Sequence, residues 1–232
     1  YMTKKILLIN ILTHGDELIG KKIAEEIFRK YSFLIENGVD IQIANERAYK
    51  EGKRYIDHDL NRMFPGKSGG SYEENRAFEL SHIVASYRLV IDIHSTESGA
   101  KDMVIITKTD TATMKLLKYL SPKYVLYMNM KPDTSLISQA QVGIAFEMGS
   151  DKNEETYLKT FASLELVLSY LDLIPAVSSP DFLIHYFNVF SSVSKPIGAK
   201  LESHIENFKL IKKGEVFARE IEGTNIVAHE DF

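Results

Sequence analysis

Short apolar runs alternate with amphipathic segments along most of the chain, and this alternation predicts its regular structure. The apolar runs indicate strands at residues 6–12, 39–44, 89–94, 103–107, 124–128 and 142–147. Apolar positions spaced three and four apart indicate helices at residues 15–31, 71–86, 111–120 and 153–173. We therefore expect an α/β fold with a mixed, mostly parallel sheet flanked by helices.

Two stretches depart from this alternation. Residues 45–70 are polar and charged and lack either periodicity, which is typical of a long functional loop. Beyond Pro175 and the Ser178-Ser179-Pro180 segment, helical patterns end and short β segments separated by glycines follow. The sequence thus predicts a main domain over residues 1–177 and a small C-terminal β domain over residues 178–232.

Composition narrows the chemistry that this fold can carry. The 232 residues include no cysteine, which excludes disulfides, thiolate metal sites and a cysteine nucleophile. The formal net charge of −4 does not suggest a nucleic-acid surface. Because no apolar run approaches the roughly 20 residues of a membrane helix, and the first run lacks a signal-peptide cleavage pattern, we expect a soluble cytoplasmic protein without membrane contact.

A histidine and a glutamate lie three positions apart directly after the first predicted strand, in Thr13-His14-Gly15-Asp16-Glu17. If a helix begins at Gly15, side chains at this spacing share a face and can bind one metal ion. By itself the pair is ambiguous. Asp16 or Glu17 could instead serve the dipole of the helix, and His14 could be a solvated loop residue.

Three ionisable residues end predicted strands: His14, His94 and Glu147. Ligands of open α/β sheets bind at this edge. Two histidines and one carboxylate leave a fourth zinc position open for water, as in catalytic sites. Asp92 shares a strand face with His94, so it can orient that imidazole, although it can also be a polar strand residue that meets solvent or a helix N-terminus.

The sequence resembles the succinylglutamate desuccinylase/aspartoacylase family, relatives of the zinc carboxypeptidases. Four blocks in the order of the family carry the resemblance: residues 14–17, 54–64, 92–96 and 142–147. It extends over residues 5–150 and, more weakly, over residues 195–217. It implies a zinc carboxypeptidase-like fold.

The resemblance also implies the metal site and the proton carrier. His14, Glu17 and His94 would bind one Zn²⁺ per chain, and Glu147 would be the general base and acid. This division agrees with the chemistry. Zinc lowers the pKa of its bound water toward 7, and an unligated carboxylate can pass the water proton to a leaving amine.

The loop block carries further roles that the resemblance implies. Arg54 would stabilise the oxyanion, and Asn61 with Arg62 would hold a carboxylate of a small-molecule substrate. The alternative is a solvated loop tied by surface ion pairs. We favour function because three matched positions would otherwise coincide by chance.

The sequence departs from the family at two places. In aspartoacylases a tyrosine and an arginine shortly before the catalytic strand contact the side-chain carboxylate of the substrate, and residues 131–139 lack both in register. Lys131 could compensate, but an acidic N-acyl amino acid becomes a less certain substrate. The chain also stops at Phe232, where family members continue through further β structure, so we expect a shorter relative or a truncated chain.

The leading functional hypothesis is a zinc-dependent deacylase that hydrolyses the amide bond of an N-acyl amino acid or related small amide, with Glu147 as general base. A carboxypeptidase-like metallopeptidase acting on C-terminal residues is the first alternative. A catalytically inactive binding module is the second, and the presence of Glu147 weighs against it. The sequence leaves the acyl group, the amino acid and the oligomeric state open.

Overall fold

The computed structural model describes residues 5–96, 102–128, 130, 133–192 and 196–231, and the account below concerns these residues. The chain divides into two compact units, Tyr1–Phe190 and Ser191–Phe232. The first unit contains a seven-stranded sheet with helices, and the second contains a three-stranded sheet. None of the described helices has the length and apolar character needed to cross a membrane.

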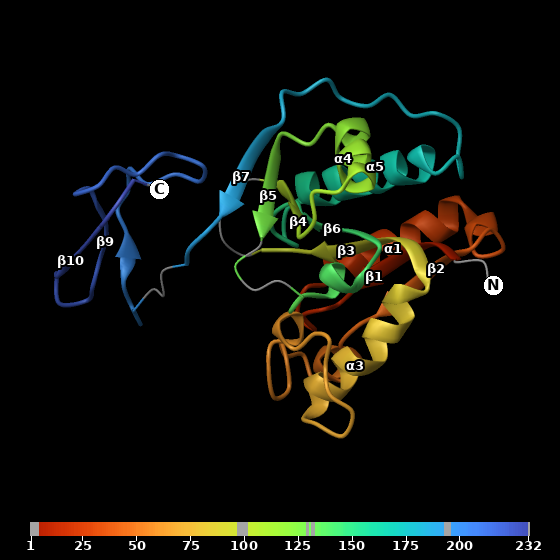
Figure 1. The fold of residues 1–232 in the computed structure, drawn as a ribbon, viewed down its shortest axis with the longest axis horizontal. Helices are drawn as coiled ribbons and strands as arrows, with labels where there is room; N and C mark the ends of the chain where they lie inside the picture. Colours follow the sequence, from red (N-terminus) through yellow and green to blue (C-terminus); the bar gives the residue numbers. More distant parts are fainter. Residues whose placement is uncertain (1–4, 97–101, 129, 131–132, 193–195, 232) are drawn as a thin grey trace. The chain divides into compact units, whose positions relative to one another are not determined.

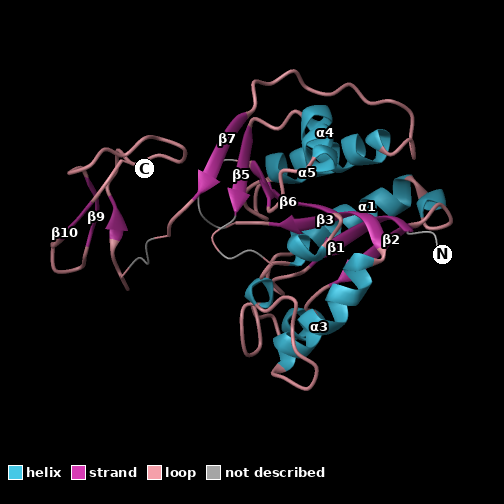
Figure 2. Ribbon diagram, viewed as in Figure 1, coloured by secondary structure: helices cyan, strands magenta, loops and turns pink. Residues whose placement is uncertain are grey.

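The strands of the first unit form one mixed sheet (Figures 1 and 2). They are β1 (Lys5–Ile11), β2 (Val39–Ile43), β3 (Tyr87–His94), β4 (Met103–Ile106), β5 (Tyr124–Met128), β6 (Val142–Glu147) and β7 (His185–Val189). Their order is β2-β1-β3-β6-β4-β5-β7, and only the β4–β6 pair is antiparallel. The predicted mixed, mostly parallel sheet is therefore confirmed.

Helices cover both faces of this sheet. The helices are α1 (Ile19–Lys30), α2 (Glu46–Lys50), α3 (Tyr72–Ala85), α4 (Thr111–Leu120) and α5 (Glu154–Tyr170), with short 3₁₀ turns η1 (Ser32–Leu34), η2 (Leu60–Arg62) and η3 (Leu136–Gln139). Residues of α1, α4 and α5 share one apolar core with Leu7 and Ile9 of β1, whereas α3, η2 and η3 share another with Leu8. Figure 1 shows α3 on one side of the sheet and α4 and α5 on the other. Because the central strands are buried on both faces, they appear in the sequence as continuous apolar runs.

The prediction that a helix begins at Gly15 is wrong, because α1 begins only at Ile19. The preceding residues form a turn in which the Glu17 amide donates to the His14 carbonyl oxygen at 3.1 Å. The carboxylate of Asp151, which follows β6, accepts from the Leu18 amide at 2.6 Å and from the Ile19 amide at 3.2 Å. A side chain distant in the sequence therefore satisfies the first free amides of α1 and fixes where the helix starts.

The predicted start of the small domain at residue 178 falls too early. The strand at residues 185–189 joins the main sheet as β7, parallel to β5, with Tyr124 opposite His185. The second unit then consists of β8 (Lys200–Leu201), β9 (Val216–Arg219) and β10 (Asn225–Val227), paired antiparallel in the order β10-β9-β8. The expected small β domain is present, but it is shorter than predicted.

The loop predicted at residues 45–70 contains α2 and η2 but is otherwise irregular, and one buried carboxylate holds part of it in place. Glu73, in the first turn of α3, is 0% exposed. It accepts from the backbone amides of Ile56, Asp57 and His58 at 2.7, 2.9 and 3.2 Å, and from the side chain of Asn45 at 3.1 Å. This anchoring lies between Arg54 and Asp59, both of which reach the candidate site.

Candidate metal centre

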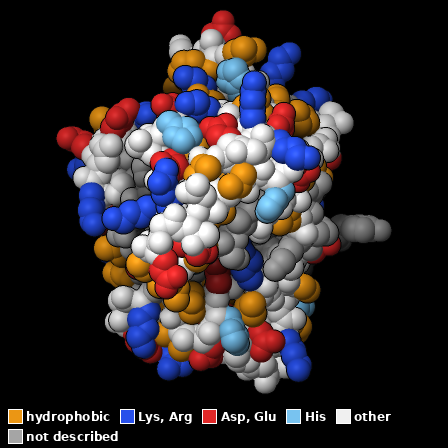
Figure 3. Space-filling model, turned by 90° about the vertical axis from the view of Figure 1, so that its left-hand side faces the viewer, with side chains coloured by type: hydrophobic (Ala, Val, Ile, Leu, Met, Phe, Trp, Pro, Cys, Tyr) orange, Lys and Arg blue, Asp and Glu red, His pale blue; other side chains and the backbone are white. Residues whose placement is uncertain are grey.

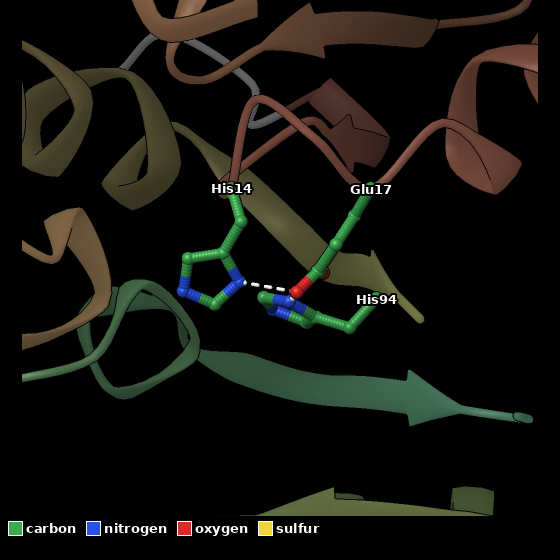
Figure 4. Close-up of side chains that lie close together, drawn as sticks. All are labelled: His14, Glu17 and His94. Atoms are coloured by element: carbon green, nitrogen blue, oxygen red, sulfur yellow. Dashed lines mark hydrogen bonds and ion pairs between the residues drawn. The ribbon is translucent and has the colours of Figure 1, made fainter. Parts of the chain in front are cut away.

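Three buried side chains meet where β1 and β3 end. His14 and Glu17 come from the turn after β1, and His94 is the last residue of β3. One potential ligand atom of each lies within 4.8 Å of the others. Glu17 Oε1 is 2.7 Å from His14 Nδ1, and Glu17 Oε2 is 2.9 Å from His94 Nδ1. Figure 4 shows the carboxylate of Glu17 between the two imidazole rings, so the predicted ligands do come together.

This donor set fits a single zinc ion. Two imidazole nitrogens and one carboxylate oxygen are a common protein ligand set of catalytic zinc, and they leave further coordination positions free for water or substrate. Both Nδ1 atoms face the same carboxylate, so they are the nitrogens available to a shared cation. The Nε2 atom of each ring points outward, away from the Glu17 carboxylate.

Each outward nitrogen has a carboxylate partner. His94 Nε2 lies 2.8 Å from Asp92 Oδ2, and His14 Nε2 lies 3.1 Å from Asp59 Oδ1. Such carboxylate–histidine pairs fix the tautomer and orientation of metal-binding imidazoles. The predicted contact of Asp92 with His94 is confirmed. The contact of Asp59 was not anticipated, because 45 positions of sequence separate it from His14.

A buried network in turn holds Asp92. Its Oδ1 accepts from Asn10 Nδ2 at 2.6 Å and from Thr13 Oγ1 at 2.8 Å, and the residue is 0% exposed. Neither Asn10 nor Thr13 belongs to the residues predicted from the sequence to serve the site. The available signal was Asn10 itself, a polar residue inside an otherwise apolar strand, which needs a hydrogen-bond partner when buried.

The electrostatics of the cluster favour a cation beside Glu17. Burial alone would raise the pKa of Glu17, but hydrogen bonds from His14 and His94 outweigh it and hold the pKa well below its usual value. Burial would likewise lower the pKa of His94, yet Asp92 and Glu17 raise it well above the ordinary range. Glu17 and Asp92 therefore stay ionised, and a divalent cation that binds here displaces the proton that His94 carries in the metal-free cluster.

Glu147 ends β6, next to the strand that ends in His94. In the parallel β3–β6 pair it lies in register with His94. Burial raises the pKa of Glu147 to about 7, so its carboxyl group can exchange a proton near neutral pH. Glu17 and Glu147 both line a cavity of about 780 Å³. His14 thus follows β1, and His94 and Glu147 end the next two strands of the sheet, β3 and β6. The sequence predicted the strand ends but not that these strands are neighbours.

Arg54 reaches the same cavity. Its Nη1 donates to Glu17 Oε1 at 2.8 Å, and its Nη2 lies 3.2 Å from His14 Nε2. The backbone explains this placement, because the Gly15 amide donates to the Arg54 carbonyl oxygen at 3.0 Å. A Cβ at Gly15 would lie 2.3 Å from the Tyr49 nitrogen, so only glycine permits this close approach of the two loops.

Asn61 and Arg62 lie further out. The side-chain oxygen of Asn61 accepts from the Leu136 amide at 3.0 Å, which joins η2 to η3. Arg62 is exposed and donates to the Asn61 carbonyl oxygen at 2.8 Å. Neither appears among the described residues that line the cavity. Lys131 lies outside the described residues.

Comparison with known sequences gives a family match. The model of the succinylglutamate desuccinylase/aspartoacylase catalytic domain matches residues 4–174. A probable aspartoacylase from Nostoc sp. is 31% identical over 185 residues, which cover 69% of this chain and 62% of that protein, less than two thirds of its length. An N-acyl-aromatic-L-amino acid amidohydrolase (carboxylate-forming) from Xenopus laevis is 25% identical over 251 residues, covering 93% of this chain and 82% of that protein.

Solved structures show the same fold. Murine aminoacylase 3 aligns with a TM-score of 0.79 at 19% identity, over 98% of this chain and 87% of that one. A succinylglutamate desuccinalase from Vibrio parahaemolyticus aligns with a TM-score of 0.70 at 19% identity, over 100% of this chain and 76% of that one. At this level of identity the likeness establishes the fold alone.

Proposed function

Because this chain belongs to the succinylglutamate desuccinylase/aspartoacylase catalytic-domain family, we propose that it hydrolyses the amide bond of an N-acyl amino acid or a related small amide. The observation that carries the proposal is the buried His14–Glu17–His94 group with Glu147 at the same edge of the sheet. Two relatives, a probable aspartoacylase and an N-acyl-aromatic-L-amino acid amidohydrolase, are named for the hydrolysis of amides, which supports an amide as the substrate.

We infer that His14, Glu17 and His94 hold one Zn²⁺. When bound, zinc supplies Lewis acidity that lowers the pKa of water and polarises the scissile carbonyl group. Asp59 and Asp92 would keep the two imidazole rings oriented toward the ion through their Nε2 atoms.

Glu147 carries the proton in this proposal. Its carboxylate takes a proton from the attacking water as the new C–O bond forms. It then delivers this proton to the amide nitrogen as the C–N bond breaks, releasing a carboxylate and an amine. The raised pKa, about 7, supports both steps because the group is neither too weak a base nor too weak an acid near neutral pH.

Arg54 contributes a positive charge at the edge of the cavity. The Arg54 guanidinium borders the cavity beside Glu17, where it can stabilise negative charge developing on the carbonyl oxygen. Asn61 and Arg62 are not among the described residues that line the cavity, and the family resemblance is what assigns them to a carboxylate of the substrate. The Asn61 oxygen is engaged with Leu136, so its NH₂ group is the donor that remains for this role.

Metal analysis of protein purified without chelator tests the site. We expect about one zinc per chain in the wild type and a large loss of zinc in a His94→Ala variant with unchanged secondary structure. A His94→Ala variant that keeps the full zinc content would refute the assigned ligands.

A substrate panel tests the reaction. N-acyl amino acids and peptides with a free C-terminus are compared at equal zinc loading. Turnover of the N-acyl amino acids supports the deacylase proposal, whereas turnover confined to peptides identifies a carboxypeptidase-like enzyme. Zinc binding without turnover of either class identifies a binding module.

A further inference from the structure

The strand beyond Glu147 brings an apolar wall to the catalytic edge. β4 runs antiparallel to β6, and Met103 lies in register with Glu147. His94 lies in register with Glu147 from the other side, in β3. A metal ligand, the proton carrier and a thioether side chain therefore follow one another across three neighbouring strands.

Met103 and Ile105 belong to the face of β4 that borders the cavity. Their neighbours Val104 and Ile106 are 1% exposed and belong to the core on the opposite face. Met103 and Ile105 are half-buried and both line the cavity, together with the exposed side chain of Leu18. Ile105 also packs against the second apolar core, the one that contains Leu8. This part of the cavity wall is apolar.

Charged side chains of the cavity belong to other elements. Among the described residues that line it, the three cations are Arg54, which is paired with Glu17, Lys22 of α1, and Lys152 of the turn after β6. All four residues of β4 are uncharged. A substrate carboxylate placed against β4 would lose hydration without gaining a partner from that strand, whereas an alkyl or aromatic group would gain from leaving water.

We propose that Met103 and Ile105 form an apolar specificity subsite. It accepts an uncharged apolar group of the substrate, either an alkyl acyl chain or an aliphatic or aromatic amino-acid side chain, in preference to a second carboxylate. The proposal rests on the proposed amide hydrolysis, since Glu147 locates the scissile bond beside these residues.

Two substrate series measure the preference with the zinc-loaded full chain. In one, the acetyl group is constant and N-acetyl-L-leucine is compared with N-acetyl-L-aspartate. In the other, the amino acid is constant and N-pentanoyl-L-alanine is compared with N-succinyl-L-alanine. In at least one series we expect kcat/KM to favour the apolar member by about 10-fold or more. Equal or inverse preference in both series would overturn the proposal.

Variants tie the preference to the two side chains. Met103→Lys and Ile105→Lys should reduce the preference or invert it, because each adds a cation to the subsite, while zinc content stays at the wild-type level. The smaller changes Met103→Ala and Ile105→Ala should weaken the preference where a lysine variant does not fold. Leu158→Lys, at an exposed apolar position of α5, is the matched control and should change neither the substrate preference nor the zinc content. An unaltered preference in the alanine variants contradicts the proposal.

A binding measurement separates this inference from the proposed function. Calorimetry with a Glu147→Gln variant gives Kd for the same compounds without turnover. Tighter binding of the apolar member, with no hydrolysis by the wild type, would support the subsite and refute the reaction. Hydrolysis by the wild type together with tighter binding of the acidic member would support the reaction and refute the subsite.

Discussion

Glu147 is the residue on which the proposed chemistry depends most directly. Replacing it by glutamine preserves size but removes the proton acceptor, so we expect kcat to fall by about 10²–10⁴-fold with zinc content unchanged. Steady-state kinetics together with metal analysis check this. A Glu147→Gln variant with wild-type kcat would exclude the role.

The same residue predicts the pH profile. A base must be unprotonated, and burial raises the pKa of Glu147 to about 7, so kcat/KM should rise with pH and level off above that value. A bound cation lowers the pKa of a nearby carboxyl group, which places the acid limb at or below pH 7. A kcat/KM that shows no fall at any pH below 7 would be inconsistent with this assignment.

Asp59 and Asp92 are predicted to act through the histidines that they contact. In Asp59→Asn and Asp92→Asn variants the partner of Nε2 loses its negative charge, so zinc affinity should fall by about 10–100-fold. Competition with a chromophoric chelator measures the change. Asp110→Asn is the control, because Asp110 caps α4 without contacting the site, and its zinc affinity should equal that of the wild type.

The sequence identified the candidate metal ligands, which the structure brings together, more completely than the residues that hold those ligands in place. His14, Glu17 and His94 belong to blocks that resemble a known family, and they end strands whose apolar runs are easily recognised. Asp59 could not be paired with His14 in the same way, because the contact depends on the path of an irregular loop. Glu73 and Gly15 set that path, and the contacts of neither residue can be predicted from the sequence around it.

The turn between β1 and α1 depends on close backbone packing. In Gly15→Ala the added Cβ would overlap the backbone near Tyr49, so we expect a loss of stability of about 1–3 kcal/mol and weaker zinc binding. Urea unfolding and chelator competition measure the two effects. Gly52→Ala is the comparison. Gly52 has φ of +62° with nothing within 4 Å, so we expect a backbone cost of about 1 kcal/mol and unchanged zinc affinity.

At the scale of elements, periodicity located the central strands and the long helices but failed at two places. It placed the start of α1 too early, because the carboxylate that caps the helix comes from Asp151, far along the chain. It assigned residues 185–189 to the small domain, because alternation identifies a strand but not the sheet that it joins. Both errors concern partners distant in sequence, which local patterns do not encode.

For the whole molecule, metal binding and folding should be linked. A ligand that binds only the folded chain stabilises it by about 2.7 kcal/mol when present at 100 times its Kd. Adding Zn²⁺ to chelator-treated protein should therefore raise the melting temperature in a concentration-dependent way. The His94→Ala variant should lack this rise, and an equal rise in that variant would place the zinc elsewhere.

Acidic, basic and hydrophobic side chains are interspersed over the face shown in Figure 3, and the formal net charge of the chain is −4. Nucleic-acid binding instead relies on clustered positive charge. The charges that matter for the proposed reaction are the few that border the cavity.

The hydrogen bonds of Glu73 order in advance a part of the loop that reaches the candidate metal centre. Because its carboxylate already engages three successive backbone amides, the stretch between Arg54 and Asp59 has been restricted before any metal or substrate arrives. An irregular segment normally loses conformational entropy when it is ordered by a ligand, and this loss weakens binding. Here that entropy is lost during folding, so the segment is preorganised and binding energy from the substrate remains available for the reaction itself.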